Sequence, residues 1–240
     1  MIQPWVQTVS GRPFDLLAPR AEDVVVADIA HALSRINRFS GHTIGEPYSV
    51  AHHSMLVADL LASWGAPVAV VREGLLHDAP EAYYGDTVSP VAAAMRSASN
   101  AAVGALPDML RARQEGECTA ARDAAWYALT RPLHDLHERI DRVVRAALSL
   151  PAIEPAIVKR ADLVALAIER RDLMAPCERD WELPEYAPAS APCGRLHGYE
   201  ARPTMTRERI DGSSLCAWQY ARDRFAAYLA ELDAQIGGAT

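Results

Sequence analysis

The amino-acid sequence predicts an all-α protein. Apolar residues recur at intervals of three and four positions along almost all of the 240 residues, which is the period of an amphipathic helix. Segments in which apolar and polar residues alternate, as in half-buried strands, are nearly absent from the sequence. The length is typical of one large domain covering residues 1–240, and the 50% hydrophobic content excludes a chain that is disordered throughout.

Several of the predicted helices begin or end at residues with a clear chemical role. Ser49 is placed to cap a helix by accepting a hydrogen bond from its first-turn amides. Pro67 suits the first position of the next helix, and Pro80 prevents that helix from continuing far past His77. The predicted helices cover residues 22–37, 49–63, 67–77, 119–129, 133–149, 155–174 and 214–236.

Two stretches do not fit regular helix. Residues 96–118 are rich in Ala, Arg and Gly without an apolar stripe, so we expect an insertion between helices. Residues 176–203 contain repeated prolines, so we expect a crossing on the surface rather than a lid over a site. The motif-bearing core is then about residues 22–175, followed by a C-terminal helix. We expect that helix to be anchored by the aromatic residues Trp181, Trp218, Tyr220, Phe225 and Tyr228.

Charge and composition restrict the partners. The net charge of -7 is the wrong sign for DNA or RNA, so no polymeric nucleic acid is expected. No run of 18 apolar residues occurs, and Pro4, Gly11 and Pro13 interrupt the start of the chain, so we expect a cytoplasmic protein without a membrane partner. The cysteines form no CxxC pair and are expected to be reduced; a zinc site built from Cys177, Cys193 and His197 is a minor alternative.

The densest group of ionisable residues in the sequence is His77-Asp78-Ala79-Pro80-Glu81, followed by Gly85-Asp86. An imidazole and a carboxylate suit a divalent transition metal, but two ligands are too few to hold one. A similar run, residues 134–138, also begins with His-Asp, but it lacks the spelling of a zinc protease and is expected to be a charged outer face.

Two further residues are candidate ligands because they lie on apolar helix faces. His53 shares a face with Val50 and Val57, and a buried histidine needs a partner, which is either a metal or a carbonyl group. Asp162 shares a face with Val158 and is costly to bury unless a metal or an arginine compensates its charge. His52 is assigned no ligand role.

These residues, in this order on separate helices, resemble the H…HD…D pattern of the HD-domain metal-dependent phosphohydrolases. The wider spelling is most similar to bacterial 5′-deoxynucleotidases and to phage enzymes that remove triphosphate from dATP. Four stretches carry the resemblance: Arg38-Phe39; Ala51-His52-His53-Ser54; His77-Asp78-x-x-Glu81 with Gly85-Asp86; and Ala161-Asp162-Leu163 running on to Glu169-Arg170-Arg171-Asp172-Leu173-Met174.

The resemblance implies an HD-domain helical bundle with one divalent metal ion, which could be manganese, cobalt, zinc, magnesium or iron. It implies a small-molecule nucleotide substrate and a homo-oligomer. Phe39 stands where the deoxynucleotidases have a tryptophan that blocks a ribose 2′-hydroxyl. The implied roles are metal binding for His53, His77, Asp78 and Asp162, phosphate binding for Arg38, and proton transfer or substrate positioning for Glu81 and Asp86.

The expected reaction is hydrolysis of deoxynucleoside 5′-monophosphates to nucleoside and phosphate. One departure leaves the number of phosphates open. Relatives often have a lysine shortly after the proline at position 90, whereas this chain continues with Val91, so the phosphate contact of that lysine is either lost or supplied by another cation such as Arg96 or Lys159. Two alternatives therefore remain: a dATP triphosphohydrolase that releases triphosphate, and a non-catalytic nucleotide-binding regulatory module. For Glu81, a solvated position at a helix start is also open.

Overall fold

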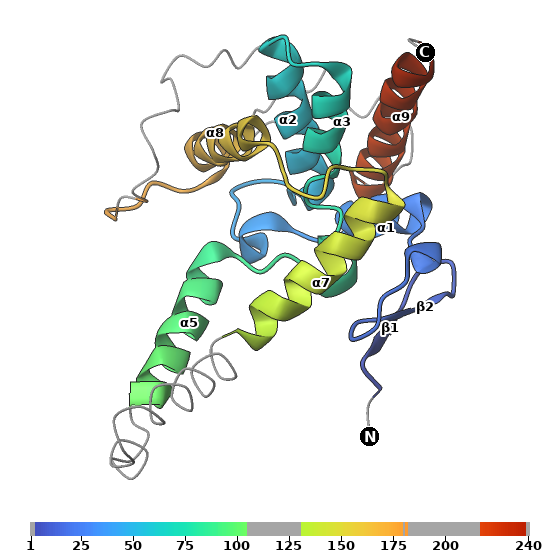
Figure 1. Cartoon of the computed structure of the whole chain (residues 1–240). Helices are drawn as coiled ribbons and strands as arrows, with labels where there is room; N and C mark the ends of the chain where they lie inside the picture. Colours follow the sequence, from blue (N-terminus) through green and yellow to red (C-terminus); the bar gives the residue numbers. More distant parts are fainter. Residues whose placement is uncertain (1–2, 105–130, 180, 182–216, 239–240) are drawn as a thin grey trace.

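The computed structural model describes residues 3–104, 131–179, 181 and 217–238, and these ranges are predominantly helical, which confirms the all-α prediction (Figure 1). The predicted helix 119–129 lies outside the described residues, as do Cys118, Cys193, His197 and Cys216. The helices are α1 (Val26–Leu33), α2 (Val50–Ser63), α3 (Val68–Leu76), α4 (Glu81–Tyr84), α5 (Ser89–Gly104), α7 (Pro132–Ala147), α8 (Ala156–Leu173) and α9 (Ala217–Gly237).

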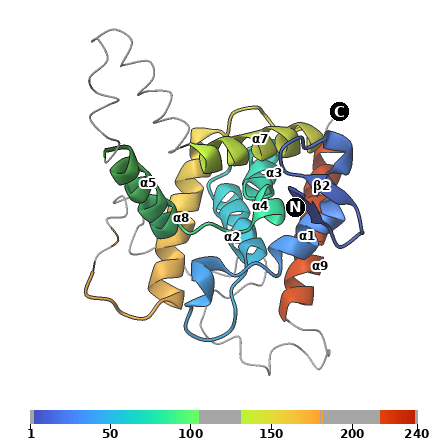
Figure 2. The same cartoon turned by 90° about the horizontal axis from the view of Figure 1, so that it is seen from below.

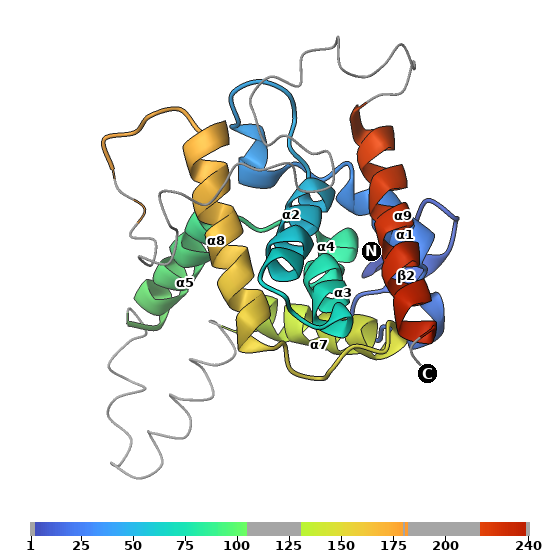
Figure 3. The same ribbon diagram turned by 90° about the horizontal axis from the view of Figure 1, so that it is seen from above.

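Helix α2 lies at the centre of the bundle, between α8 on one side and α9 and α1 on the other (Figures 2 and 3). Every residue from Val50 to Leu61 is buried, as expected for a helix covered on all sides. Helix α3 packs closely on α2 at Gly74, where a Cβ atom would collide with the side chain of Leu61. The absence of a side chain at Gly74 permits this close approach. The site-bearing parts of α2 and α3 are therefore held next to each other by the core itself.

The chain begins with a short hairpin that the sequence analysis did not predict. Strand β1 (Trp5–Gln7) pairs antiparallel with β2 (Pro13–Asp15), with Val6 opposite Phe14. Phe14 is fully buried, and its ring stacks on that of Tyr83 with centroids 3.7 Å apart. Strands of three residues are too short to show a recognisable alternation, so only this contact reveals the hairpin's place in the core.

The first predicted helix, 22–37, is longer than the helix that forms. A 3-10 turn, η1 (Ala21–Asp23), precedes α1, and Val24 and Val25 between them are extended, as β-branched residues favour. After α1 the chain is extended at Asn37, which pairs with Ser49 in an isolated β-bridge. This bridge places the residues that follow Asn37 beside the N-terminus of α2.

Helix α5 corrects the interpretation of residues 96–118. The part of that stretch up to Gly104 continues a regular helix that begins at Ser89, and the remainder lies outside the described residues. In Figure 1, α5 extends away from the bundle. The absence of an apolar stripe fits this position, since Val91 and Met95 on α5 are about half exposed, at 48% and 47%.

The C-terminal helix α9 is anchored only in part as predicted. Phe225 is fully buried, and the hydroxyl of Tyr228 donates a 2.9 Å hydrogen bond to Asp59 on α2. Tyr220 is instead exposed. Trp181 lies near Phe39, with ring centroids 5.9 Å apart. Among the described residues, no helix combines the length and the apolar character needed to cross a membrane.

A buried ion pair joins α3 to α7. Arg145 donates through Nη2 to Oε1 of Glu73 and through Nε to the carbonyl oxygen of Pro151 at 2.6 Å. Both side chains are nearly inaccessible, with residue exposures of 4% for Arg145 and 1% for Glu73. This pair fixes the end of α7 against the core.

Candidate metal centre

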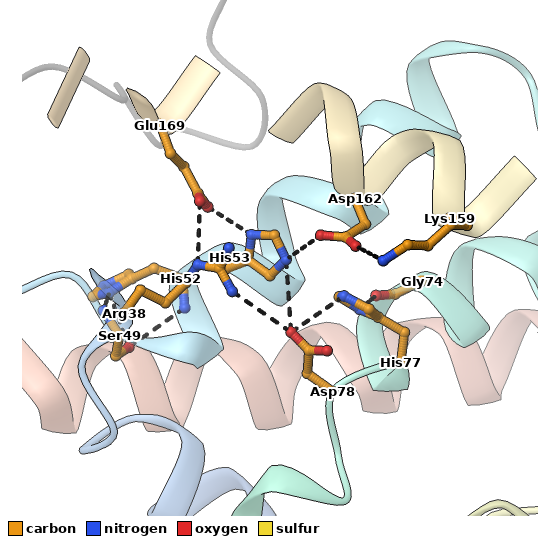
Figure 4. Close-up of polar contacts among 10 residues, drawn as sticks. All are labelled: Arg38, Ser49, His52, His53, Gly74, His77, Asp78, Lys159, Asp162 and Glu169. Carbon is orange, nitrogen blue, oxygen red and sulfur yellow. Dashed lines mark hydrogen bonds and ion pairs between the residues drawn. The ribbon is translucent and has the colours of Figure 1, made fainter. Parts of the chain in front are cut away.

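Three helices bring the predicted ligand residues together (Figure 4). His53 comes from the first turn of α2, and His77 caps the C-terminus of α3, so that Asp78 follows it directly. Asp162 comes from the second turn of α8. The Nε2 atom of His53 lies 3.1 Å from Asp162 Oδ1 and 3.6 Å from Asp78 Oδ2, and His77 Nε2 lies 3.2 Å from the same Asp78 oxygen.

Both imidazoles are held through their other nitrogen. His53 Nδ1 lies 2.6 Å from Oε1 of Glu169, and His77 Nδ1 lies 2.8 Å from the carbonyl oxygen of Gly74. Since these oxygens can only accept hydrogen bonds, each Nδ1 is the protonated nitrogen and, in the neutral ring, each Nε2 has a free lone pair. In histidines that bind metals, the ring nitrogen that does not bind the metal is usually hydrogen-bonded in this way.

The spacing of the facing atoms fits a shared cation. Ligand atoms that lie ~2.1 Å from one ion at octahedral or tetrahedral angles are about 3.0–3.4 Å apart. Candidate ligand atoms of His53, His77 and Asp78 all lie within 4.8 Å of one another, and Asp162 adjoins them through His53. The buried Nε2 atoms of His53 and His77 make no hydrogen bond of acceptable geometry despite the nearby carboxylates. Imidazole and carboxylate together suit a divalent transition metal.

Electrostatics around the histidines supports this fit. Burial and Arg38 act to lower the pKa of His53, but Glu169 and Asp162 outweigh them and raise it to about 9. Burial likewise lowers the pKa of His77, and the Asp78 carboxylate more than offsets it, so that this pKa is raised. The surrounding carboxylates thus favour a positive charge at this point, and a bound divalent cation would replace the protons on the imidazoles.

The Asp162 carboxylate has two different neighbours. Its Oδ1 faces His53, whereas Oδ2 accepts a 2.6 Å hydrogen bond from the ammonium group of Lys159. The cation paired with Asp162 is therefore a lysine and not the arginine considered as an alternative. Burial acts to raise the pKa of Asp162, but the close approach and charge of the His53 imidazole outweigh it, and the net pKa is lowered. Arg96, the other candidate for the missing lysine, is exposed on α5.

Arg38 reaches the same cluster from the turn η2 (Arg38–Gly41). Its backbone N–H donates to the carbonyl of Tyr48 at 2.9 Å, which fixes its position beside α2. Its side chain donates from Nε to Oε2 of Glu169 at 3.1 Å, and Nη1 lies 3.9 Å from Asp78 Oδ2. Burial alone would lower the pKa of Arg38, but Glu169 and Asp78 outweigh it and raise it, so the guanidinium is permanently charged.

Phe39 lies at the edge of the site, with its ring 5.4 Å from the guanidinium carbon of Arg38. Its φ of 55° is in the left-handed region, which bulky residues rarely adopt. Strained backbone of this kind is frequent at functional sites. The ring of Trp181 lies 5.9 Å from that of Phe39 and approaches the guanidinium of Arg170, whose carbon is 5.3 Å from the Trp181 ring centre.

Glu81 and Asp86 lie within electrostatic reach of the cluster, since the charges of Asp78 and Arg38 act on both of them. Oε2 of Glu81 is buried and has no hydrogen-bond partner among the described residues, while the residue as a whole is half-buried at the start of α4. Burial first, and then the charges of Asp78 and Asp86, raise the pKa of Glu81 far above its ordinary value. Burial also raises the pKa of Asp86.

The two adjacent histidines of α2 have opposite hydrogen-bonding roles. His52 Nδ1 accepts a 3.2 Å hydrogen bond from the backbone N–H of Ser49, and the Ser49 hydroxyl accepts from the His52 backbone, which completes a capping box. His52 Nδ1 is therefore an acceptor, whereas His53 Nδ1 is a donor. Burial lowers the pKa of His52 to about 4, and its side chain serves the helix start.

Glu169, for which the sequence predicts no role, lies in contact with both His53 and Arg38. One signal was available: Glu169 follows Asp162 by seven positions on α8, which is about two helical turns and therefore the same face. The second His-Asp run behaves as predicted, because His134, Asp135 and Glu138 have side chains 54%, 56% and 57% exposed.

The fold and the site together define an all-α protein with a buried candidate metal centre. No family model matches the chain. It is 33% identical over 186 residues to "Uncharacterized protein YfdR" of Escherichia coli (strain K12), an alignment covering 78% of this chain and 82% of that protein. It is also 32% identical over 174 residues to "Uncharacterized protein RCAP_rcc00048" of Rhodobacter capsulatus, covering 71% of each. The chain belongs to the same family as these two proteins.

Proposed function

We propose that the protein is an HD-type metal-dependent phosphohydrolase that converts deoxynucleoside 5′-monophosphates to nucleoside and orthophosphate. The observation that carries the proposal is the pair of buried imidazoles whose Nδ1 atoms are anchored and whose Nε2 atoms face Asp78 and Asp162. Arg38 beside this cluster supplies the fixed positive charge that a phosphate group requires.

The negative charge of the cluster also indicates that a phosphate substrate binds only together with a divalent metal ion. Once a metal has displaced the protons of the two imidazoles, the described side chains in and around the cluster include four carboxylates, from Asp78, Asp86, Asp162 and Glu169, against the cations of Arg38 and Lys159, while Glu81 keeps its proton. A phosphate dianion would be repelled by such a site unless a divalent ion compensated the charge. When bound by His53, His77, Asp78 and Asp162, the ion would polarise the phosphoryl group and lower the pKa of a water.

The remaining residues have roles that follow from their surroundings. Arg38 would bind a phosphate oxygen, and the Phe39 ring beside it would contact the sugar. In the reaction, a water oxygen forms a bond to phosphorus, and the bond from phosphorus to the 5′-oxygen breaks. Glu81, whose carboxyl can keep a proton at neutral pH, would donate that proton to the 5′-oxygen, and the proton released by the attacking water would restore the Glu81 carboxyl group. The negative charge of Asp86 would help to keep Glu81 protonated.

Release of triphosphate from a deoxynucleoside triphosphate is the second candidate reaction. It is favoured by Lys159, which lies beside Asp162 and offers a phosphate chain a cation in place of the lysine absent after Pro90. Lys159 would contact the phosphate chain from the α8 side. The products separate the two reactions, because one gives orthophosphate and the other gives tripolyphosphate.

The proposal is tested with metal-free protein reloaded separately with Mn²⁺, Co²⁺, Zn²⁺, Mg²⁺ or Fe²⁺. Each form is incubated with ribo- and deoxynucleoside mono- and triphosphates, and the products are identified. Orthophosphate from deoxynucleoside monophosphates is expected. Tripolyphosphate would establish the second candidate, and tight nucleotide binding without products would establish a regulatory module instead.

The chain offers a matched control for the ligand assignment, because it contains a second His-Asp dipeptide. Replacing His77 and Asp78 by alanine is expected to abolish both metal content and hydrolysis. Replacing the exposed His134 and Asp135 by alanine is expected to change neither. Unchanged metal content in the first double variant would refute the assignment.

A further inference from the structure

Glu169 is a buried carboxylate whose two oxygens serve different partners in the candidate metal centre (Figure 4). The residue is 1% exposed. Oε1 lies 2.6 Å from Nδ1 of His53, and Oε2 accepts a 3.1 Å hydrogen bond from Nε of Arg38. One side chain of α8 therefore contacts both a proposed metal ligand and the proposed phosphate-binding residue.

Helix α8 fixes the His53 ring at both nitrogens. Asp162 approaches Nε2, and Glu169, seven residues further along the same helix, approaches Nδ1. The ring is thus held in one plane between two carboxylates of one rigid element, and its orientation follows that of α8. A metal ligand oriented in this way loses little freedom when it binds the ion.

A carboxylate is the one ordinary side chain of this size that can accept from two donors at once in this arrangement. The Nδ1–H of His53 and the Nε–H of Arg38 are both donors. A glutamine at this position would satisfy one of them with its carbonyl oxygen and turn its NH₂ group towards the other. Either Arg38 or His53 would then lose its partner and its fixed orientation.

We propose that Glu169 is a positioning residue that orients His53 for the metal and Arg38 for the phosphate, and so sets the affinities for both ligands together. This inference rests on the proposed function. It extends that proposal, because it links two binding events through a residue that touches neither ligand.

Glu73 provides a control of the same kind for the test. It is also 1% exposed and also paired with an arginine, Arg145, but that pair lies between α3 and α7. Metal-free unmodified protein, Glu169→Gln and Glu73→Gln are each titrated with Mn²⁺, Co²⁺ and Zn²⁺ by calorimetry. The metal-loaded forms are then titrated with orthophosphate.

Glu169→Gln is expected to weaken metal binding about 10- to 100-fold, as is typical for loss of a partner behind a ligating histidine. It is also expected to weaken orthophosphate binding about tenfold, because Arg38 loses a charge-assisted hydrogen bond that orients it. Glu73→Gln is expected to lower the stability of the fold and to leave both affinities unchanged in the folded protein.

Three results would overturn the inference. Unchanged affinities in Glu169→Gln would do so while the proposed function remained, and so would an equal loss of affinity in both glutamine variants. No metal binding by the unmodified protein would overturn both proposals. A further measurement needs no variant: in ¹⁵N spectra of the zinc-loaded protein, the His53 ring is expected to show protonation at Nδ1, and protonation at Nε2 would contradict the arrangement.

Discussion

Two buried glutamate–arginine pairs occur in different regions of the bundle, and they do different things. Glu73 pairs with Arg145 between α3 and α7, and Glu169 pairs with Arg38 at the candidate metal centre. Both glutamates are 1% exposed, so burial does not distinguish them. The two pairs differ in their other partners. In the first pair, Arg145 also donates to the backbone carbonyl of Pro151, whereas in the second pair the other oxygen of Glu169 contacts His53.

The two pairs differ in the further contacts that their residues make, and these contacts determine whether a pair can affect ligand binding. In the first pair, the contacts end in the backbone of the loop after α7. In the second, they continue to the imidazole of His53 and, through Nη1 of Arg38, to Asp78. Removing a member of either pair disturbs charge in the interior, but only the second pair is expected to transmit that disturbance to ligand binding.

The largest expected effect on stability comes from breaking the first pair. Arg145→Met should lower the free energy of unfolding by about 3–5 kcal/mol, because Glu73 is left buried without a countercharge. Arg38→Met should cost less, since Glu169 keeps its contact with His53. Urea unfolding of the three metal-free proteins measures both values. The comparison fails if Arg145→Met is as stable as the unmodified protein, or if its folded form no longer binds metal.

A second prediction concerns the pH dependence of the free energy of unfolding, to which His52 contributes as a residue of the helix start and not as a metal ligand like its neighbour His53. Burial lowers the pKa of His52 to about 4, whereas the unfolded chain has the ordinary value of 6.5. The unfolded state therefore takes up this proton first as the pH falls, and the stability present above pH 6.5 is lost towards pH 4. The loss corresponds to roughly 3 kcal/mol.

The variant His52→Gln isolates this contribution. Glutamine at the third helical position can still accept from the Ser49 N–H and preserve the capping box, but it does not titrate. Urea unfolding at pH 7 and pH 4 should show a smaller loss of stability in the variant than in the unmodified protein. Equal losses in the two proteins would mean that the proton is not taken up at His52.

The smallest expected effect on stability belongs to a third ion pair, between Lys159 and Asp162. The Lys159 side chain is 63% exposed, so Lys159→Met should change the free energy of unfolding by less than ~1 kcal/mol. If Lys159 contacts the phosphate chain, the same change should raise KM up to roughly tenfold, and Lys159→Arg should largely preserve it. Steady-state kinetics decides this, and an unaltered KM in Lys159→Met would remove the residue from substrate binding.

Much of the fold could be predicted from the sequence, because local signals mark helix ends. Ser49 and Pro67 lie at the starts of α2 and α3, and the helices predicted at 133–149 and 155–174 match α7 and α8 within a few residues. The misses have local causes too. The hairpin is too short to show a pattern, and α5 lacks the apolar stripe that identifies a packed helix.

The residues of the candidate site could be predicted where a polar side chain lies on an otherwise apolar face of its helix. Asp162 and His53 were singled out because a polar group on an apolar stripe needs a partner. Glu169 could not be predicted in this way, because it begins the charged run Glu169-Arg170-Arg171-Asp172 and the sequence does not show which residue of that run is buried. Only the tertiary structure shows that its two oxygens lie opposite His53 and Arg38.

The sequence by itself determined the helical architecture and the chemical groups available, since a rotation of 100° per residue assigns side chains to the faces of each helix. Only the tertiary structure decided which faces meet. His77-Asp78 and His134-Asp135 are the same dipeptide, yet one joins a buried cluster and the other is exposed on α7. The difference arises from the packing of α2, α3 and α8 around a common core, which brings together side chains that are far apart in the chain.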